Sequence, residues 1–171
     1  MGEGQFWRGA TARDLADILA MADQLHPSFP EDPAVFAERL QLYPAGMRLL
    51  ELNGRACGYL VSHPWRAREV PPLNTLLHRL PTEADTFYLH DLALLPAARG
   101  GGAARAIVED MAAHARSQGF ATMSLVAVNG SIAFWQRMGF AIAIEPTLAA
   151  KLASYEPAAR LMMRDLGASG P

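Results

Sequence analysis

Three consecutive glycines, Gly100 to Gly102, constrain the fold of this chain more than any other feature. They follow an apolar run of strand character at 86–95 and open a predicted helix at 100–118. Glycine adopts positive φ freely, so the triplet permits a tight turn in which backbone N–H groups converge. The partial positive charge of a helix N-terminus makes such a turn suitable for a phosphate. The sequence therefore predicts an α/β fold with an anion site here, although a turn without a ligand also remains open.

Missing motifs narrow the identity of the phosphate ligand. A dinucleotide-binding GxGxxG that starts at Gly100 needs a small residue at position 105, where the chain has Arg105. A Walker-type loop needs Gly-Lys-Ser/Thr, but the sequence has one lysine, Lys151. Neither GxSxG nor HExxH occurs, and the histidines lack metal-ligand spacing. We therefore expect no metal site and no hydrolase of these classes.

Length, charge and cysteine content set the broad class. The chain has 171 residues, a formal net charge of −2 and one cysteine, Cys57. This length suits a single domain over residues 1–171 whose core needs no disulfide. Neither a signal-like segment nor an apolar run of membrane-spanning length occurs. We expect a cytoplasmic protein that binds no membrane, and the near-neutral charge disfavours nucleic acid as a partner.

Turn and capping signals predict the order of the elements. Thr11 and Asp14 form a capping pair, and Asn53-Gly54 is a strong hairpin signal. Gly119 and Gly139 stand where left-handed helix C-caps are expected. The predicted order is β α α β β β α β α β β. Strands are expected at 5–10, 48–52, 55–63, 86–95, 123–128, 140–144 and 160–164, and helices from the Thr11 cap to 25 and at 33–42, 100–118 and 131–138.

The segment 64–85 is too long for an ordinary connection in a compact domain. It contains four prolines, yet it also carries Trp65, Val70, Leu73 and further leucines. Such a segment is too apolar for disorder. We therefore expect a packed flap over a site.

Two stretches in sequence order resemble signatures of the GCN5-related N-acetyltransferases. The pyrophosphate loop of that family's motif A reads R/Q-x-x-G-x-G/A, and Arg99, Gly102 and Ala104 occupy its fixed positions after Leu92 to Pro96. The family's second signature is an Asn after the next strand and a helix ending in aromatic-x-x-x-Gly-Phe. It is matched here by Asn129, Ser131, Phe134-Trp135 and Gly139-Phe140.

This resemblance implies a single-domain α/β fold of the GNAT type, with a mixed, mostly antiparallel central sheet flanked by helices. It implies acetyl-CoA as co-substrate and transfer of the acetyl group to a primary amine by direct attack in a ternary complex. The implied cofactor-binding residues are Leu92, Ala93, Leu94, Arg99, Gly100, Gly101, Gly102, Ala103, Ala104, Arg105, Asn129 and Trp135.

The strand around His90 is also similar to the His-x-His-x-Leu-Ala-Val strand of the serotonin-type arylalkylamine N-acetyltransferases, with Tyr88 at the first histidine. An amine nucleophile is mostly protonated at neutral pH, and imidazole is suited to accept its proton. His90 is therefore the expected base, although a histidine bonded to a backbone carbonyl in the core also fits. Strand alternation predicts one face with Tyr88, His90, Leu92 and Leu94 and the opposite face with Phe87, Leu89 and Asp91.

Asp91 and Trp135 have no straightforward role in this predicted site. Asp91 lies in a central strand and needs a partner, for which we prefer an arginine to a substrate ammonium. Trp135 stands where the family often has a tyrosine whose hydroxyl protonates the departing thiolate, and indole cannot act as that acid. The thiolate then leaves unaided, takes a proton from water, or takes one from Tyr88, the second expected catalytic residue.

Three functions are open. The flap at 64–85 favours a small-molecule amine as acceptor, whereas a protein N-terminus or lysine would need an open groove. A non-catalytic CoA-binding module belongs to a different class, and thioester turnover separates it from both enzymes. The sequence leaves a homodimer open.

Overall fold

A seven-stranded sheet forms the centre of the molecule in the computed structural model, which describes residues 4–167. Its strand order is β1-β2-β3-β4-β5-β7-β6. Neighbouring strands are antiparallel except β4 and β5, which are parallel. The predicted mixed, mostly antiparallel sheet is confirmed. The strands are β1 (Gln5–Gly9), β2 (Met47–Leu52), β3 (Arg55–Trp65), β4 (Thr86–Leu94), β5 (Thr122–Ala127), β6 (Ala141–Ile142) and β7 (Arg160–Asp165).

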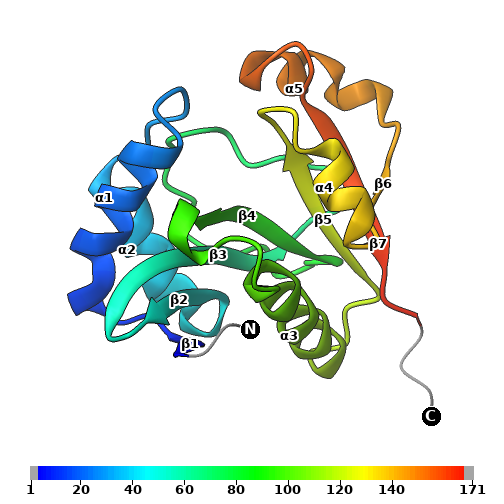
Figure 1. Cartoon of the computed structure of the whole chain (residues 1–171). Coiled ribbons are helices and arrows are strands. Elements are labelled where there is room, and N and C mark those ends of the chain that lie inside the picture. The colour runs from blue at the N-terminus through cyan, green and yellow to red at the C-terminus, as the bar shows by residue number, and fades with distance from the viewer. Residues whose placement is uncertain (1–3, 168–171) are drawn as a thin grey trace.

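Helices cover both faces of the sheet (Figure 1). One face is covered by α1 (Leu15–Leu25) and α2 (Pro33–Leu42), and the other by α3 (Ala103–Ser117) and α4 (Ile132–Arg137). On the first face Ile18 and Phe36 pack with Tyr59, and on the second Ile107 packs with Phe87. No helix within residues 4–167 is long and apolar enough to cross a membrane.

Local signals determine several element boundaries as predicted. A capping box between Thr11 and Asp14 precedes α1, and α2 has the predicted bounds. Asn53 and Gly54 both have positive φ, as a tight hairpin turn requires. The long helix begins at Ala103 rather than at Gly100, because the glycines form the turn before it.

The C-terminal third differs from the prediction. Of the expected strand at 140–144, only Ala141–Ile142 pairs with β7. Pro146 then opens a 3-10 turn that leads into an unpredicted helix, α5 (Ala149–Tyr155). Proline fixes φ and lacks an N–H, so it ends strand pairing and suits the first turn of a helix.

The connection between β3 and β4 is 66–85 rather than the predicted 64–85, because β3 runs to Trp65, and it is packed in part, with Val70 buried and Leu76 40% exposed. Val70 is buried against Leu148 and Leu161, at the α5 end of the sheet. Farther along, the Glu38 carboxylate of α2 accepts hydrogen bonds from the backbone N–H groups of Leu77 and His78, at 2.7 and 2.9 Å. The segment is thereby held at both ends.

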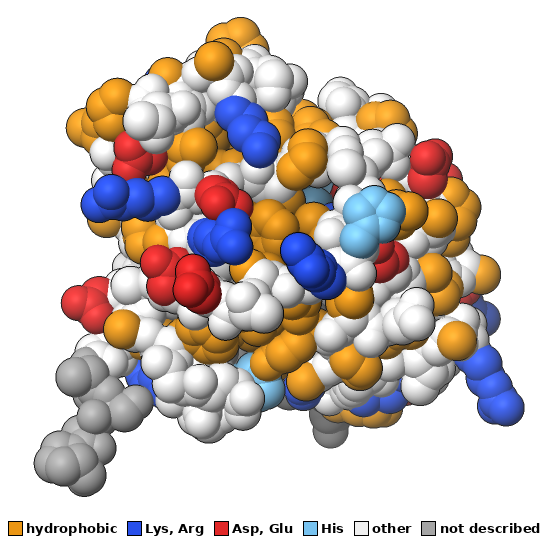
Figure 2. Space-filling model, turned by 180° about the vertical axis from the view of Figure 1, so that it is seen from behind, with side chains coloured by type: hydrophobic (Ala, Val, Ile, Leu, Met, Phe, Trp, Pro, Cys, Tyr) orange, Lys and Arg blue, Asp and Glu red, His pale blue; other side chains and the backbone are white. Residues whose placement is uncertain are grey.

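Figure 2 shows the reverse side of the molecule, where charges of both signs lie among apolar side chains.

Candidate active site

The glycine turn exposes its backbone to open space. Gly100 and Gly102 have φ of +82° and +81°, and a Cβ built on either meets no atom within 4 Å. The first helical hydrogen bond of α3 runs from the Ala106 N–H to the Gly102 carbonyl. The N–H groups of Ala103, Ala104 and Arg105 therefore lie before that bond, and no side chain caps the helix. Convergent donors at a helix N-terminus form an anion site.

A cavity of about 640 Å³ opens beside this turn, and we call it the donor cavity. It extends along the end of β4 to the start of α4. Most of the predicted cofactor residues line it, whereas Gly101 does not and Trp135 lines an adjoining cavity instead. Its wall consists of Leu25, His26, Leu92, Ala93, Leu94, Ala98, Arg99, Gly100, Gly102, Ala103, Ala104, Arg105, Asn129, Ser131, Phe134 and Met138.

Arg99 and Arg105 lie on the wall of the donor cavity, and each donates a hydrogen bond to a backbone carbonyl. The Arg99 Nε donates to the Leu94 carbonyl at 3.0 Å, and the Arg105 Nη2 donates to the Arg137 carbonyl at 3.0 Å. Both side chains are exposed and line the cavity. They therefore brace the turn and add positive charge beside the free N–H groups.

A bulge in β4 overturns the predicted alternation of its side chains. Val61 of β3 pairs with Asp91, whereas the next residue of β3 pairs with Leu89, so His90 is the extra residue. Before the bulge, Leu89 packs toward α3, and after it Leu92 does. His90 and Asp91 consequently face the same side, toward α1 and α2, because one inserted residue shifts the period of a strand. The prediction that Leu92 and Leu94 share the His90 face, with Asp91 opposite, is wrong.

The strands β4 and β5 part just beyond Leu89 and Leu125, the last residues that pair between them. A cavity of about 160 Å³, the connecting cavity, lies at this opening. Trp135 lines it and is 8% exposed, with its ring 4.9 Å from that of Phe134 and 5.5 Å from that of Phe140. Trp135 is thus a packed wall residue, and its neighbour Phe134 lines both the donor and the connecting cavities.

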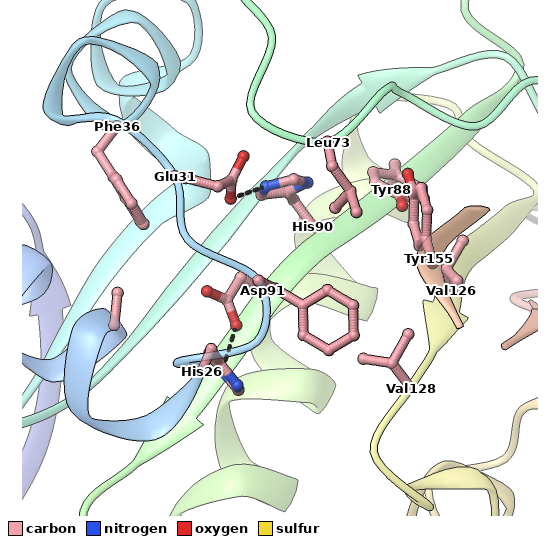
Figure 3. A pocket seen from close by; sticks show the side chains of 12 residues that line it. His26, Glu31, Phe36, Leu73, Tyr88, His90, Asp91, Val126, Val128 and Tyr155 are labelled. Carbon is pink, nitrogen blue, oxygen red and sulfur yellow. Dashed lines mark hydrogen bonds and ion pairs between the residues drawn. The ribbon is translucent and has the colours of Figure 1, made fainter. Parts of the chain in front are cut away.

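A third cavity of about 70 Å³, the acceptor cavity, lies on the far side of the opening (Figure 3). Two ion pairs stand side by side in it. The Glu31 Oε1 lies 2.6 Å from the His90 Nε2, and the Asp91 Oδ1 lies 2.9 Å from the His26 Nε2. The rest of the wall is largely apolar or aromatic: Ala22, Phe29, Phe36, Leu73, Tyr88, Val126, Val128 and Tyr155.

Neighbouring groups shift the pKa values of Glu31 and His26 at the acceptor cavity. Burial opposes ionisation of Glu31, but its hydrogen-bonded contact with His90 and the positive charge of Arg39 outweigh burial and lower the Glu31 pKa. The Asp91 carboxylate raises the pKa of His26 against the opposing effect of burial. Asp91 is itself held by the Tyr59 hydroxyl, which donates to Oδ2 at 2.5 Å. The expected arginine partner of Asp91 is therefore wrong, since histidine and tyrosine take that place.

Tyr88 shares the His90 face as predicted, but it is remote from the donor cavity. It is 2% exposed and lines the acceptor cavity, not the donor or the connecting one. Burial raises its pKa well above the usual value, and its hydroxyl bonds to that of Tyr155. The Tyr155 hydroxyl in turn donates to the Pro71 carbonyl. Tyr88 therefore joins the flap to the sheet.

The family described as "Acetyltransferase (GNAT) family" matches residues 14–140, which include the glycine turn and the second signature. The chain belongs to this family. It is an N-acetyltransferase, and acetyl-CoA is its co-substrate, as the motifs predicted. A comparison with curated protein sequences finds no match.

Solved structures resemble the acetyltransferase over nearly its whole length. The ribosomal-protein-S18-alanine N-acetyltransferase of Escherichia coli is 18% identical, with a TM-score of 0.66 and coverage of 97% of this chain and 96% of that one. Naa50 of Arabidopsis thaliana, in complex with a bisubstrate analogue CoA-Ac-MVNAL, is 14% identical, with a TM-score of 0.69 and coverage of 95% and 99%. N-acetylglutamate synthase of Neisseria gonorrhoeae is 18% identical, with a TM-score of 0.71 and coverage of 98% and 36%. At these identities the likeness shows the fold.

Sequence reasoning missed three polar residues of the acetyltransferase's acceptor side. His26 and Glu31 lie in the proline-bearing connection between α1 and α2, and Tyr59 lies within β3. The available signal was the occurrence of ionisable residues in a rigid, proline-bearing segment. Among residues 4–167 no cluster of three or more His, Cys, Asp or Glu could hold a metal ion.

Proposed function

We propose that this acetyltransferase acetylates the primary amine of a small molecule with an apolar body, and that residues 1–171 are one N-acetyltransferase domain. The observation that carries the acceptor class is an unpartnered carboxylate oxygen. The Glu31 side chain is 8% exposed, and its Oε2 is buried and makes no hydrogen bond of normal geometry to the described residues, although the Asn74 backbone N–H lies near enough to help lower the Glu31 pKa. A buried ionised oxygen in this state is costly unless a cation or donor meets it. A substrate ammonium supplies both.

The surroundings of Glu31 support the same acceptor. Among the described residues, no lysine or arginine lines the acceptor cavity, and the positive charge of Arg39, which acts on Glu31, comes from a residue outside the cavity wall. The aromatic rings of Phe29 and Phe36 and the side chain of Leu73 form its apolar part. An amine that carries a small apolar or aromatic group fits this combination.

The size and cover of the cavity support a small molecule over a peptide. Its volume is about 70 Å³, and Leu73 of the flap closes one side. Asn74 fixes the flap to the α1–α2 connection, since its Oδ1 accepts the Asp32 N–H at 2.6 Å. A peptide acceptor needs an open groove for backbone on both sides of the reacting amine.

His90 is placed to act as the base. A carboxylate only accepts hydrogen bonds, so the nitrogen that faces Glu31, Nε2, carries the proton and Nδ1 keeps the lone pair. An ammonium at Glu31 Oε2 would lie beside this imidazole, which accepts its proton directly or through water. The freed amine then attacks the thioester carbonyl through the opening between β4 and β5, in a ternary complex with acetyl-CoA bound in the donor cavity. The Glu31 carboxylate both binds the amine and orients its base.

An acceptor panel with detection of released thiol tests this proposal. It compares arylalkyl and alkyl amines, amino acids and peptides that carry a free N-terminus, at fixed acetyl-CoA. We expect turnover with apolar amines, and in Glu31→Gln a rise of about 10- to 100-fold in the amine KM, the worth of a charge-assisted hydrogen bond. The exposed Glu83→Gln is the matched control and should behave as wild type. Turnover confined to peptides would overturn the acceptor class.

A further inference from the structure

His26 occupies the junction of the three cavities. It caps the C-terminus of α1, with φ −128° and ψ 53°, outside the helical region. Of the described residues, His26 alone lines the donor, connecting and acceptor cavities. His90, by contrast, lines the connecting and acceptor cavities only. Of the two imidazoles of the site, His26 is therefore the one that borders the donor cavity, where the thioester would lie.

The groups that face His26 favour its charged form. Asp91 of β4 approaches its Nε2 at 2.9 Å, and Tyr59 of β3 anchors the other oxygen of that carboxylate. Glu31, from the connection to α2, adds a second negative charge, and these charges raise the His26 pKa. The Nε2 contact with Asp91 is an ion pair without hydrogen-bond geometry, and no described residue bonds the Nδ1, so an imidazolium here has an Nδ1–H free to donate.

The donor cavity has few other acids. The titratable residues on its wall are His26, Arg99 and Arg105, and an arginine does not give up its proton near neutral pH. No tyrosine among the described residues lines the donor or the connecting cavity, and Trp135 stands where the resemblance leads one to expect a phenol. His26 is therefore the residue on the wall of the donor cavity that can protonate the departing thiolate, in competition with water, whereas His90 lines only the connecting and acceptor cavities.

We propose that the His26 imidazolium protonates the thiolate of CoA as the carbon–sulfur bond breaks. This inference rests on the proposed function, because it needs amine attack on the thioester. The amine nitrogen forms the C–N bond, the C–S bond breaks, and the sulfur electron pair takes the Nδ1 proton of His26. The substrate ammonium loses two protons by way of His90 and solvent. One of them restores His26 and the other is released, which balances the products: amide, thiol and one proton.

The pH dependence of kcat separates the two imidazoles. A base gives the acidic limb of the profile and an acid gives the alkaline limb. We expect His26→Gln to lower kcat by about 10²-fold and to flatten the alkaline limb, with the acidic limb kept. We expect His90→Gln to do the reverse. Asp91→Asn should shift the alkaline limb to lower pH, because the imidazolium loses its counter-charge. His114→Gln, a histidine that lines none of the three cavities, is the control.

A change of leaving group distinguishes chemistry from structure. Two short donors without the nucleotide are compared, S-acetyl-N-acetylcysteamine and S-4-nitrophenyl thioacetate, whose aromatic thiolate leaves without a proton. The loss in His26→Gln should largely disappear with the aromatic thioester. An equal loss with both donors, or an unaltered alkaline limb, overturns the inference. If His26→Gln does not fold by circular dichroism, the Asp91→Asn shift decides. A wild-type enzyme that binds CoA but acetylates no amine refutes the proposed function instead.

Discussion

His90 and Asp91 are adjacent in the sequence, yet both side chains point toward α1 and α2. The bulge opposite Val61 and Ser62 places them there, since His90 has no partner in β3. His90 then contacts Glu31, and Asp91 contacts His26. Both partners lie in the connection between α1 and α2. Consecutive residues of a regular strand would face opposite sides of the sheet, and one of the two ion pairs would be lost from the site.

The glycine turn provides a test of the donor cavity. Gly102→Asp places a negative charge at the free N–H groups and should raise the CoA dissociation constant by about 10²-fold or more, because anion binding there depends on charge. Titration calorimetry measures it. Gly119→Asp is the matched control, since it also has positive φ and open space around its Cβ but lies at the other end of α3. An unchanged dissociation constant in Gly102→Asp would eliminate this site for the pyrophosphate.

The role of His90 as base has a kinetic signature. His90→Gln should lower kcat/KM by about 10² to 10⁴ at neutral pH, the usual worth of a general base, and leave CoA affinity within a few-fold. Raising the pH should restore part of the loss, because more of the amine then arrives deprotonated. Steady-state rates with an amine identified in the panel provide the measurement. Wild-type turnover in this variant would make His90 a structural residue.

Trp135 should contribute packing rather than proton transfer. Trp135→Phe keeps an aromatic ring against Phe134 and Phe140 and should retain most activity. Trp135→Tyr introduces a phenol at the connecting cavity and should add little while His26 is present. Both are measured as kcat at saturating acetyl-CoA, with the melting temperature as a control for folding. A fall of about 10³-fold for Trp135→Phe at normal stability would mean that the indole N–H takes part in the chemistry.

His63 predicts a specific pH dependence of stability. It is 1% exposed, its Nδ1–H donates to the Pro64 carbonyl at 2.9 Å, and burial lowers its pKa to about 3. The unfolded chain binds a proton at about pH 6.5, so it holds more protons than the folded chain between pH 6.5 and 3. His63 therefore makes its full contribution to stability above pH 6.5, the pKa of the unfolded chain. Stability falls as the pH is lowered from 6.5 toward 3.

Urea unfolding at pH 7.5, 6 and 5 measures this effect. The free energy of unfolding should depend less steeply on pH in His63→Gln than in wild type. The slopes should differ by about 1 kcal/mol per pH unit below pH 6, the effect of one proton. Most carboxylates titrate below this range, and the opposing contribution of His26, whose pKa is raised, is present in both proteins. Identical slopes in the two proteins would show that His63 takes up a proton in the folded state.

Local sequence signals are enough to predict the features that depend on a few consecutive residues. The Asn53-Gly54 hairpin, the bounds of α2 and the turn before α3 follow from positive φ, proline geometry and capping, which act over one or two turns of chain. The donor cavity could be predicted for the same reason, because its anion site is a single strand–turn–helix segment. The residues of the glycine motif and the residues that form the turn are the same stretch of chain.

The acceptor side depends on contacts between residues that are far apart in the sequence. The His90–Glu31 contact joins residues 59 positions apart, and it forms because α1 and α2 pack on the same sheet face toward which the bulge turns His90. A bulge depends on the register between β3 and β4, which the sequence of β4 alone does not contain. The partner of Asp91 was mispredicted for this reason: burial selects whichever complementary group packing brings near, and here that group is His26.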